Sequence, residues 1–215
     1  MITRNLNRRK AGITCACLGL GLLPIAAPAQ VRHPLFCEFS VRRGWNANKS
    51  EYITHRAGPN DRSGVPQVIN RIYEVLSIKP HIDIYLAERE DNAFATVAGG
   101  RKIIVVDVNF VESVNKRAGT GWGAIQVIAH ELGHHIAGFS EDRHKAELNA
   151  DYWSGQALQR LGSSRAAAVR AIMALGSEED TDTHPSKHRR APTIQRGWDD
   201  AAANKVDHSF CEDCR

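Results

Sequence analysis

The chain has 215 residues, with 28 Lys or Arg against 24 Asp or Glu, and five cysteines. Four of the basic residues and none of the acidic ones lie in residues 1–29, so the remainder carries no excess charge. This balance argues against a nucleic-acid-binding surface, which needs clustered basic residues, while the length is enough for one domain with a hydrophobic core.

Residues 1–29 have the pattern of a secretory signal peptide. A basic stretch precedes an apolar run from Ala11 to Ala27, and Ala27-Pro28-Ala29 forms an A-x-A cleavage site. The run is short beside the about 20 residues of a membrane span. We therefore expect cleavage, export to the periplasm or the medium, and no stable membrane insertion. An uncleaved N-terminal membrane anchor is the alternative.

Three cysteines follow the predicted signal peptide: Cys37, Cys211 and Cys214. In an oxidising compartment we expect one disulfide from Cys37 to Cys211 or Cys214, with one thiol left over. Closing so long a loop contributes about 4–5 kcal/mol in the chain-entropy model. The alternative is a structural zinc site of these three cysteines and His208.

The first elements are predicted from turn residues and apolar spacing. Residues 30–64 are expected to be irregular, because glycine, asparagine and proline recur there. From Val65 to Ile78 apolar residues recur at spacings of three and four, which predicts an amphipathic helix that ends before Pro80.

Three strands are expected next. Residues 81–86 alternate and contain β-branched side chains, and residues 92–98 and 102–108 have a similar composition. The last two strands flank Gly99-Gly100, a pair typical of a tight hairpin turn. We therefore expect a small antiparallel sheet.

The second half of the chain is predicted to be helical. The expected helices cover residues 109–115, 120–138, 145–161, 163–175 and 185–203. The predicted class is α+β, with the small sheet packed beside a helical bundle. We expect one domain over residues 65–203 and a cysteine-containing tail over residues 204–215.

The helix over residues 120–138 contains His130-Glu131-Leu132-Gly133-His134. Histidines four residues apart lie on one helix face, about one turn apart, so both imidazoles can reach one metal ion. A glutamate between two such ligands can act as a general base toward water. We expect one Zn²⁺ per chain here, because a catalytic zinc has three protein ligands and an open position.

The third ligand must come from downstream. The residue at the position of the third histidine of metzincins is Ser140, which excludes that class. Asp142 and His144 have suitable side chains but fall in a connection. Glu147 and Asp151 are four residues apart on the next helix, so we assign Glu147 as ligand and Asp151 as the partner of one histidine's free N–H.

At these residues the chain resembles the M48-like gluzincin peptidases. The segment Glu147-Leu148-Asn149-Ala150-Asp151 after the histidine motif is similar to theirs. Asn92-Ala93-Phe94-Ala95 resembles the family's substrate-binding edge strand, and Thr183-His184-Pro185-Ser186 with Arg190 resembles its downstream element. The resemblance covers residues 65–203. No transmembrane helix follows, so the chain is similar to the compact, soluble branch.

The resemblance implies a zinc metalloendopeptidase of the cell envelope that cleaves extended or unfolded polypeptides. Glu131 would be the general base, and His184 or Arg190 would donate to the oxyanion. The strand at residues 92–95 would bind substrate by strand addition. The alternative is a catalytically degenerate zinc-binding adaptor or a periplasmic chaperone of the same fold. No oligomeric state is predicted.

Overall fold

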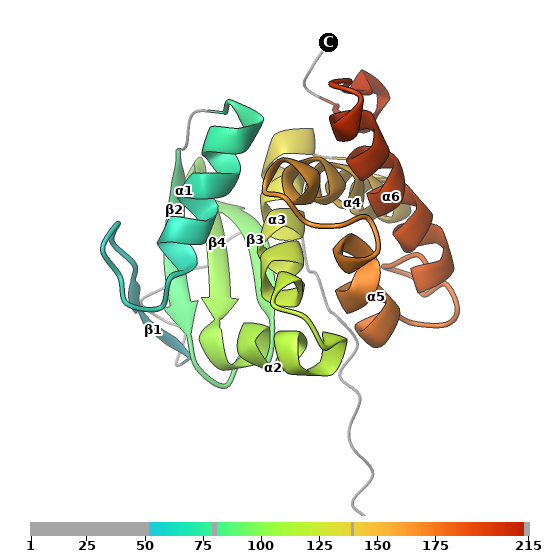
Figure 1. The fold of residues 1–215 in the computed structure, drawn as a ribbon. Coiled ribbons are helices and arrows are strands. Elements are labelled where there is room, and N and C mark those ends of the chain that lie inside the picture. Colours follow the sequence, from blue (N-terminus) through green and yellow to red (C-terminus); the bar gives the residue numbers. More distant parts are fainter. Residues whose placement is uncertain (1–51, 79–80, 139, 213–215) are drawn as a thin grey trace, which may run out of the picture. The chain divides into compact units, whose positions relative to one another are not determined.

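The computed structural model describes residues 52–78, 81–138 and 140–212. All of them belong to one compact unit that spans residues 32–215. The predicted signal peptide, Cys37 and Cys214 lie outside the described residues. The predicted α+β class is confirmed, since a four-stranded sheet is packed beside helices (Figure 1).

The sheet is mixed and its strands run in the order β1-β2-β4-β3. The strands are β1 (Ile53–Arg56), β2 (Ile82–Ala87), β3 (Ala93–Ala98) and β4 (Arg101–Asp107). The expectation of an antiparallel sheet is wrong for one pair, because β2 and β4 run parallel, with Ile84 opposite Ile104. The segment predicted to be irregular contains β1, which pairs antiparallel with β2.

The position of β4 explains the parallel pair. Residues 103–106 are buried throughout, as expected for a strand with neighbours on both sides and both faces covered. The chain therefore passes from β2 to the outer strand β3 and returns through the predicted hairpin to the centre. Gly99 and Gly100 make this turn at φ values of 57° and 76°, where glycine has no steric penalty.

The helices follow the predicted order with shifted ends. In the described residues they are α1 (Val65–Leu76), α2 (Val108–Ala118), α3 (Trp122–Ala137), α4 (Arg143–Arg160), α5 (Arg170–Leu175) and α6 (Lys187–Ala202), with the 3₁₀ turns η2 (Ala167–Val169) and η3 (His208–Phe210). The largest difference is in the helix expected over residues 163–175, which divides into η2 and α5. No helix in the described part of the chain is long and apolar enough to cross a membrane.

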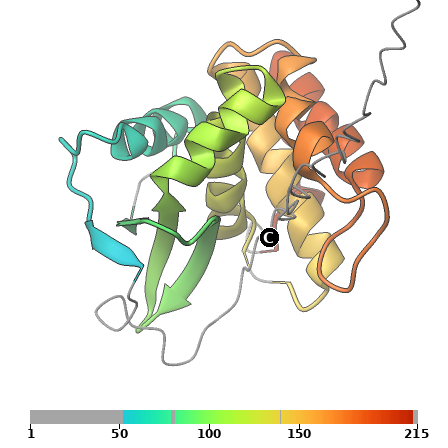
Figure 2. The ribbon, with the colours of Figure 1, turned by 90° about the horizontal axis from the view of Figure 1, so that it is seen from below.

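Helices α1 and α3 lie on the same side of the sheet (Figures 1 and 2). One buried cluster joins Ile69 and Ile72 of α1 to Ile104 and Val106 of β4 and Leu132 of α3. The sheet therefore supports α3 from one side. This packing leaves the opposite side of α3, with the two motif histidines, facing α4.

Helix α4 crosses its two neighbours at glycines. A Cβ on Gly133 of α3 would lie 2.5 Å from the carbonyl oxygen of Ala150, which is on α4. A Cβ on Gly155 of α4 would lie 2.0 Å from the carbonyl oxygen of Ile194 on α6. Real Cβ contacts are not so short, so each crossing requires glycine. Backbones at these points touch directly, which fixes α4 between α3 and α6.

The C-terminal segment after α6 packs against α4. The ring of Phe210 stacks on Tyr152 at a centroid distance of 4.3 Å, and the indole N–H of Trp153 donates to the Phe210 carbonyl at 3.0 Å. The backbone N–H of Glu212 donates to the carbonyl of Ala137 at the end of α3. Residues 204–212 thus tie α4 to the end of α3.

Replacement of Gly155 by alanine tests the α4–α6 crossing. Alanine is the better helix former by about 1 kcal/mol, yet the added methyl group must push the helices apart. We expect Gly155→Ala to lower the free energy of unfolding by about 1–3 kcal/mol in urea denaturation. Gly121→Ala is the matched control, because that site is open, and we expect a change within about 0.5 kcal/mol. Equal stability of the two variants would contradict the close crossing.

Candidate metal centre

His130 and His134 on α3 and Glu147 on α4 form a buried group that could hold a metal ion. The Nε2 atom of His130 lies 3.2 Å from Oε2 of Glu147, and Nε2 of His134 lies 3.4 Å from Oε1. One ligand atom from each residue falls within 4.8 Å of the others. Tetrahedral metal–ligand bonds of about 2.0–2.2 Å put neighbouring ligand atoms about 3.3–3.6 Å apart, so this spacing fits a shared ion.

The environment of Glu147 also fits a metal. Its Oε2 atom is buried and makes no well-aligned hydrogen bond to the described residues, although His130 Nε2 and Arg190 Nη2 lie 3.2 Å and 3.4 Å away. A buried carboxylate oxygen in this position requires positive charge nearby, which a metal ion can supply. The carboxylate reaches the histidines because Gly133, within the motif, lets α4 contact the backbone of α3.

Asp151 lies one turn after Glu147 and contacts the far side of His130. Its Oδ1 atom is 2.9 Å from Nδ1 of His130. A carboxylate in this position accepts the Nδ1–H and leaves Nε2 free for a metal. Asp151 also binds Arg190 of α6 in two places: Nε donates to Oδ2 at 2.7 Å, and Nη2 donates to Oδ1 at 2.9 Å.

The Arg190 guanidinium is buried among these groups. Its Nη2 atom lies 3.3 Å and 3.2 Å from the two ring nitrogens of His130 and 3.4 Å from Oε2 of Glu147. A bidentate ion pair with a carboxylate fixes the orientation of the guanidinium plane. Arg190 therefore connects α6 to the ligand helix through Asp151.

Glu147 and Asp151 have cationic partners without a metal. Burial lowers the pKa of His130, but the carboxylates of Asp151 and Glu147 together outweigh burial and raise the pKa to about 9. Burial raises the pKa of Glu147, but His134 and His130 outweigh it, and the pKa falls well below its usual range. Two carboxylates, Glu147 and Asp151, thus face two cations, Arg190 and protonated His130. A divalent cation would take the place of the His130 proton.

His184 borders the same group, and Glu131 follows His130 directly on α3. The Nε2 atom of His184 lies 3.8 Å from Oε2 of Glu147, and the side chain is 10 % exposed. Glu131 lies on α3 between the two histidines in sequence and is buried. The structure therefore brings His184 and Arg190 from the end of the chain to the predicted metal ligands.

His135, which follows His134 directly, points elsewhere. Its Nε2 atom is 2.9 Å from the carbonyl oxygen of Ile103 on β4. Burial lowers the pKa of His135 to about 4, so the ring is neutral at pH 7. This hydrogen bond anchors α3 to the central strand, in agreement with a packing role and not a ligand role.

The two other downstream candidates, Asp142 and His144, have structural partners, and His144 lies in the first turn of α4 and not in a connection. Asp142 caps α4, where its side chain accepts from the backbone N–H of Lys145. His144 contacts the Thr181 carbonyl at 2.7 Å and Arg189 at 3.2 Å. Neither belongs to the metal group. The alternative prediction, a zinc site of three cysteines and His208, is wrong, because Cys211 is disulfide-bonded. The other cysteine of this disulfide lies outside the described residues.

The predicted substrate strand is an outer strand of the described sheet. Ala93, Phe94 and Ala95 are in β3, which within the described residues pairs with β4, and the backbone carbonyl of Asn92, just before it, accepts from the Asp107 N–H. Helix α3 packs against β3. The strand thus runs beside the helix that carries the histidines.

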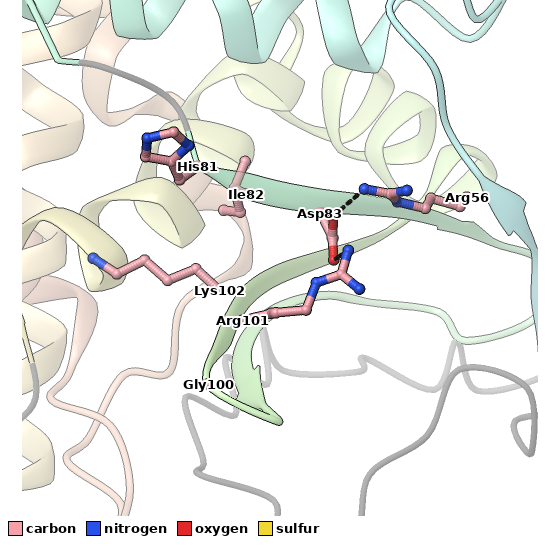
Figure 3. A pocket seen from close by; sticks show the side chains of 7 residues that line it. All are labelled: Arg56, His81, Ile82, Asp83, Gly100, Arg101 and Lys102. Carbon is pink, nitrogen blue, oxygen red and sulfur yellow. Dashed lines mark hydrogen bonds and ion pairs between the residues drawn. The ribbon is translucent and has the colours of Figure 1, made fainter.

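A pocket of about 670 Å³ lies at the start of β2 and β4, and none of the metal group's residues line it (Figure 3). Asp83 is buried at its base, with Arg56 and Arg101 on either side, and both arginines form ion pairs with it. The strands β1, β2 and β4 are joined through this buried acid. The pairs are part of the sheet's own stabilisation.

Sequence reasoning missed two features that position the site. The first is the pair of contacts between Arg190 and Asp151, which join residues 39 positions apart. The second is the set of glycine crossings at Gly133 and Gly155. Glycine is unfavourable inside a helix, so its presence there in α3 and α4 could have indicated close helix packing.

Comparison of the whole chain with protein-family models, with curated proteins and with solved structures finds no match. The geometry of the side chains therefore carries the functional argument.

Metal binding should release a proton from His130. The metal requires the neutral Nε2 atom, and the ring is protonated below its pKa of about 9. We expect the affinity for Zn²⁺ to rise with pH up to about 9 and then level off, with about one proton released at pH 7. Calorimetric titrations in buffers of different ionisation enthalpy measure this release. Asp151→Asn should reduce it, and no release from the unmodified protein at pH 7 would refute the charge balance.

Proposed function

We propose that the chain is a zinc-dependent metalloendopeptidase, similar to the compact, soluble M48-like gluzincins. The observation that carries the proposal is the convergence of two imidazoles and one carboxylate, all buried, beside Glu131. Ligands of this kind, with nitrogen and oxygen donors, are typical of catalytic zinc sites. We infer one zinc per chain, bound by His130, His134 and Glu147.

Zinc at such a site supplies Lewis acidity, which activates water and polarises the scissile carbonyl. In the proposed reaction Glu131 takes a proton from the attacking water, whose oxygen forms a bond to the carbonyl carbon. Glu131 then gives the proton to the leaving amine as the C–N bond breaks. The products are a carboxylic acid and an amine, which at neutral pH are present as carboxylate and ammonium.

His184 is the better of the two predicted oxyanion donors. Its Nε2 atom faces the ligand carboxylate, where a donor can reach an oxygen that gains charge. The Arg190 guanidinium is engaged by Asp151 through two hydrogen bonds. We therefore assign Arg190 a positioning role, in which it holds Asp151 and through it the ring of His130.

The proposed substrate is an extended or unfolded polypeptide. A chain laid along β3 would pair through main-chain hydrogen bonds, which impose little sequence preference. The pattern of residues 1–29 supports export, so the proposed place of action is the cell envelope or the medium. The alternative is a zinc-binding adaptor or chaperone of the same fold. Glu131 favours hydrolysis, because binding alone needs no general base.

Glu131→Gln separates catalysis from metal binding. The amide keeps the shape of the side chain but cannot accept the proton of water. We expect cleavage of unfolded casein to fall by at least about 100-fold, with zinc content unchanged by atomic absorption. Undiminished cleavage would remove Glu131 from the mechanism. If the unmodified, zinc-loaded protein shows no cleavage, the adaptor or chaperone alternative is favoured.

Glu147→Ala tests the third ligand. Loss of the carboxylate leaves two imidazoles, and we expect the affinity for Zn²⁺ to fall by at least about 100-fold. Glu74→Ala is the control, because Glu74 lies on the exposed face of α1 and pairs only with Arg71 among the described residues. Full zinc occupancy in Glu147→Ala, measured after dialysis against a weak chelator, would refute the assignment.

A further inference from the structure

The ring of His184 is held from its far side by the preceding residue. Oγ1 of Thr183 lies 2.7 Å from Nδ1 of His184, while Nε2 faces Glu147 at 3.8 Å. The two nitrogens of one imidazole thus have different surroundings. Which of them carries the proton decides whether His184 can donate into the site.

Two neighbours favour one position for the proton of the neutral ring. The Glu147 carboxylate can only accept hydrogen bonds, so it favours a proton on Nε2, the nitrogen that faces it. With the proton there, Nδ1 is an acceptor and the Thr183 hydroxyl donates to it. In the described part of the chain, Oγ1 of Thr183 has no other hydrogen-bond partner.

The backbone around His184 is fixed separately by Thr181. The backbone N–H of His184 donates to Oγ1 of Thr181 at 3.0 Å, and the N–H of Thr181 donates to the His184 carbonyl at 2.8 Å. The Thr181 carbonyl in turn contacts Nε2 of His144, which lies on α4 three residues before Glu147. The loop is therefore attached to α4, while Thr183 contacts the ring itself.

We propose that Thr183 is a positioning residue, whose hydroxyl donates to Nδ1 of His184 and holds the ring with Nε2–H directed at the metal group. This rests on the proposed function, in which His184 donates to the oxyanion. A hydroxyl, unlike a carboxylate, adds no negative charge behind the ring. It holds the ring's orientation and supports the Nε2–H tautomer without a further buried anion beside Glu147 and Asp151.

Thr183→Val removes the hydroxyl and keeps the side chain's shape, and Thr183→Ser restores the hydroxyl. With casein peptides we expect kcat to fall about 10-fold in Thr183→Val, the effect of about one lost hydrogen bond, with KM and zinc content unchanged. Thr183→Ser should recover most of this loss. In His184→Ala the further change Thr183→Val should have no effect. Thr193→Val is the control, since Thr193 lies on the exposed side of α6 and bonds only its own helix.

Long-range ¹H–¹⁵N NMR of the metal-free protein gives a readout that does not depend on activity. We expect the His184 ring as the Nε2–H tautomer in the unmodified protein and in Thr183→Ser, and a mixture in Thr183→Val. An Nδ1–H tautomer in the unmodified protein, or an unchanged tautomer in Thr183→Val, would overturn the proposal. Absence of proteolysis by the unmodified protein would refute the proposed function and leave the NMR result to decide the role of Thr183.

Discussion

The direct contact between the backbones of α3 and α4 is the constraint on which the candidate metal centre depends. Two histidines on one helix can present only two ligands, and the third must come from a helix close enough for a glutamate to span the gap. Gly133 provides this approach, because any larger residue would meet the carbonyl oxygen of Ala150. The glycine between the motif histidines is therefore a packing residue for the neighbouring helix.

The same principle operates on the other side of α4. Gly155 and Gly197 bring α6 against it, and α6 carries Arg190 to Asp151. Buried charges are stable only when they are paired, and here each carboxylate has a cation within reach. Arg190 thus allows both Glu147 and Asp151 to be buried in one site. The ion pair and the helix crossing depend on each other, since neither could form if α6 stood further away.

The sequence contained enough to predict the helices, the hairpin and the group of side chains that could hold a metal ion. The periodicity of apolar residues and the spacing of the motif residues are local properties of the sequence. His130, His134 and Glu147 lie on helices that are consecutive in the chain. The parallel pairing of β2 with β4 could not be predicted, because both strands are apolar and the pairing depends on which of them the helices cover. The contact of Arg190 with Asp151 depends on the path of the chain between these two residues, which no local pattern specifies.

The C-terminal segment has a consequence for the order of assembly. Residues 204–212 contact Tyr152, Trp153 and the end of α3, so a segment that follows α6 braces the helix that carries Glu147 and Asp151. During synthesis this segment leaves the ribosome after α3, α4 and α6. The candidate ligand side chains are therefore made before the segment that braces their helices.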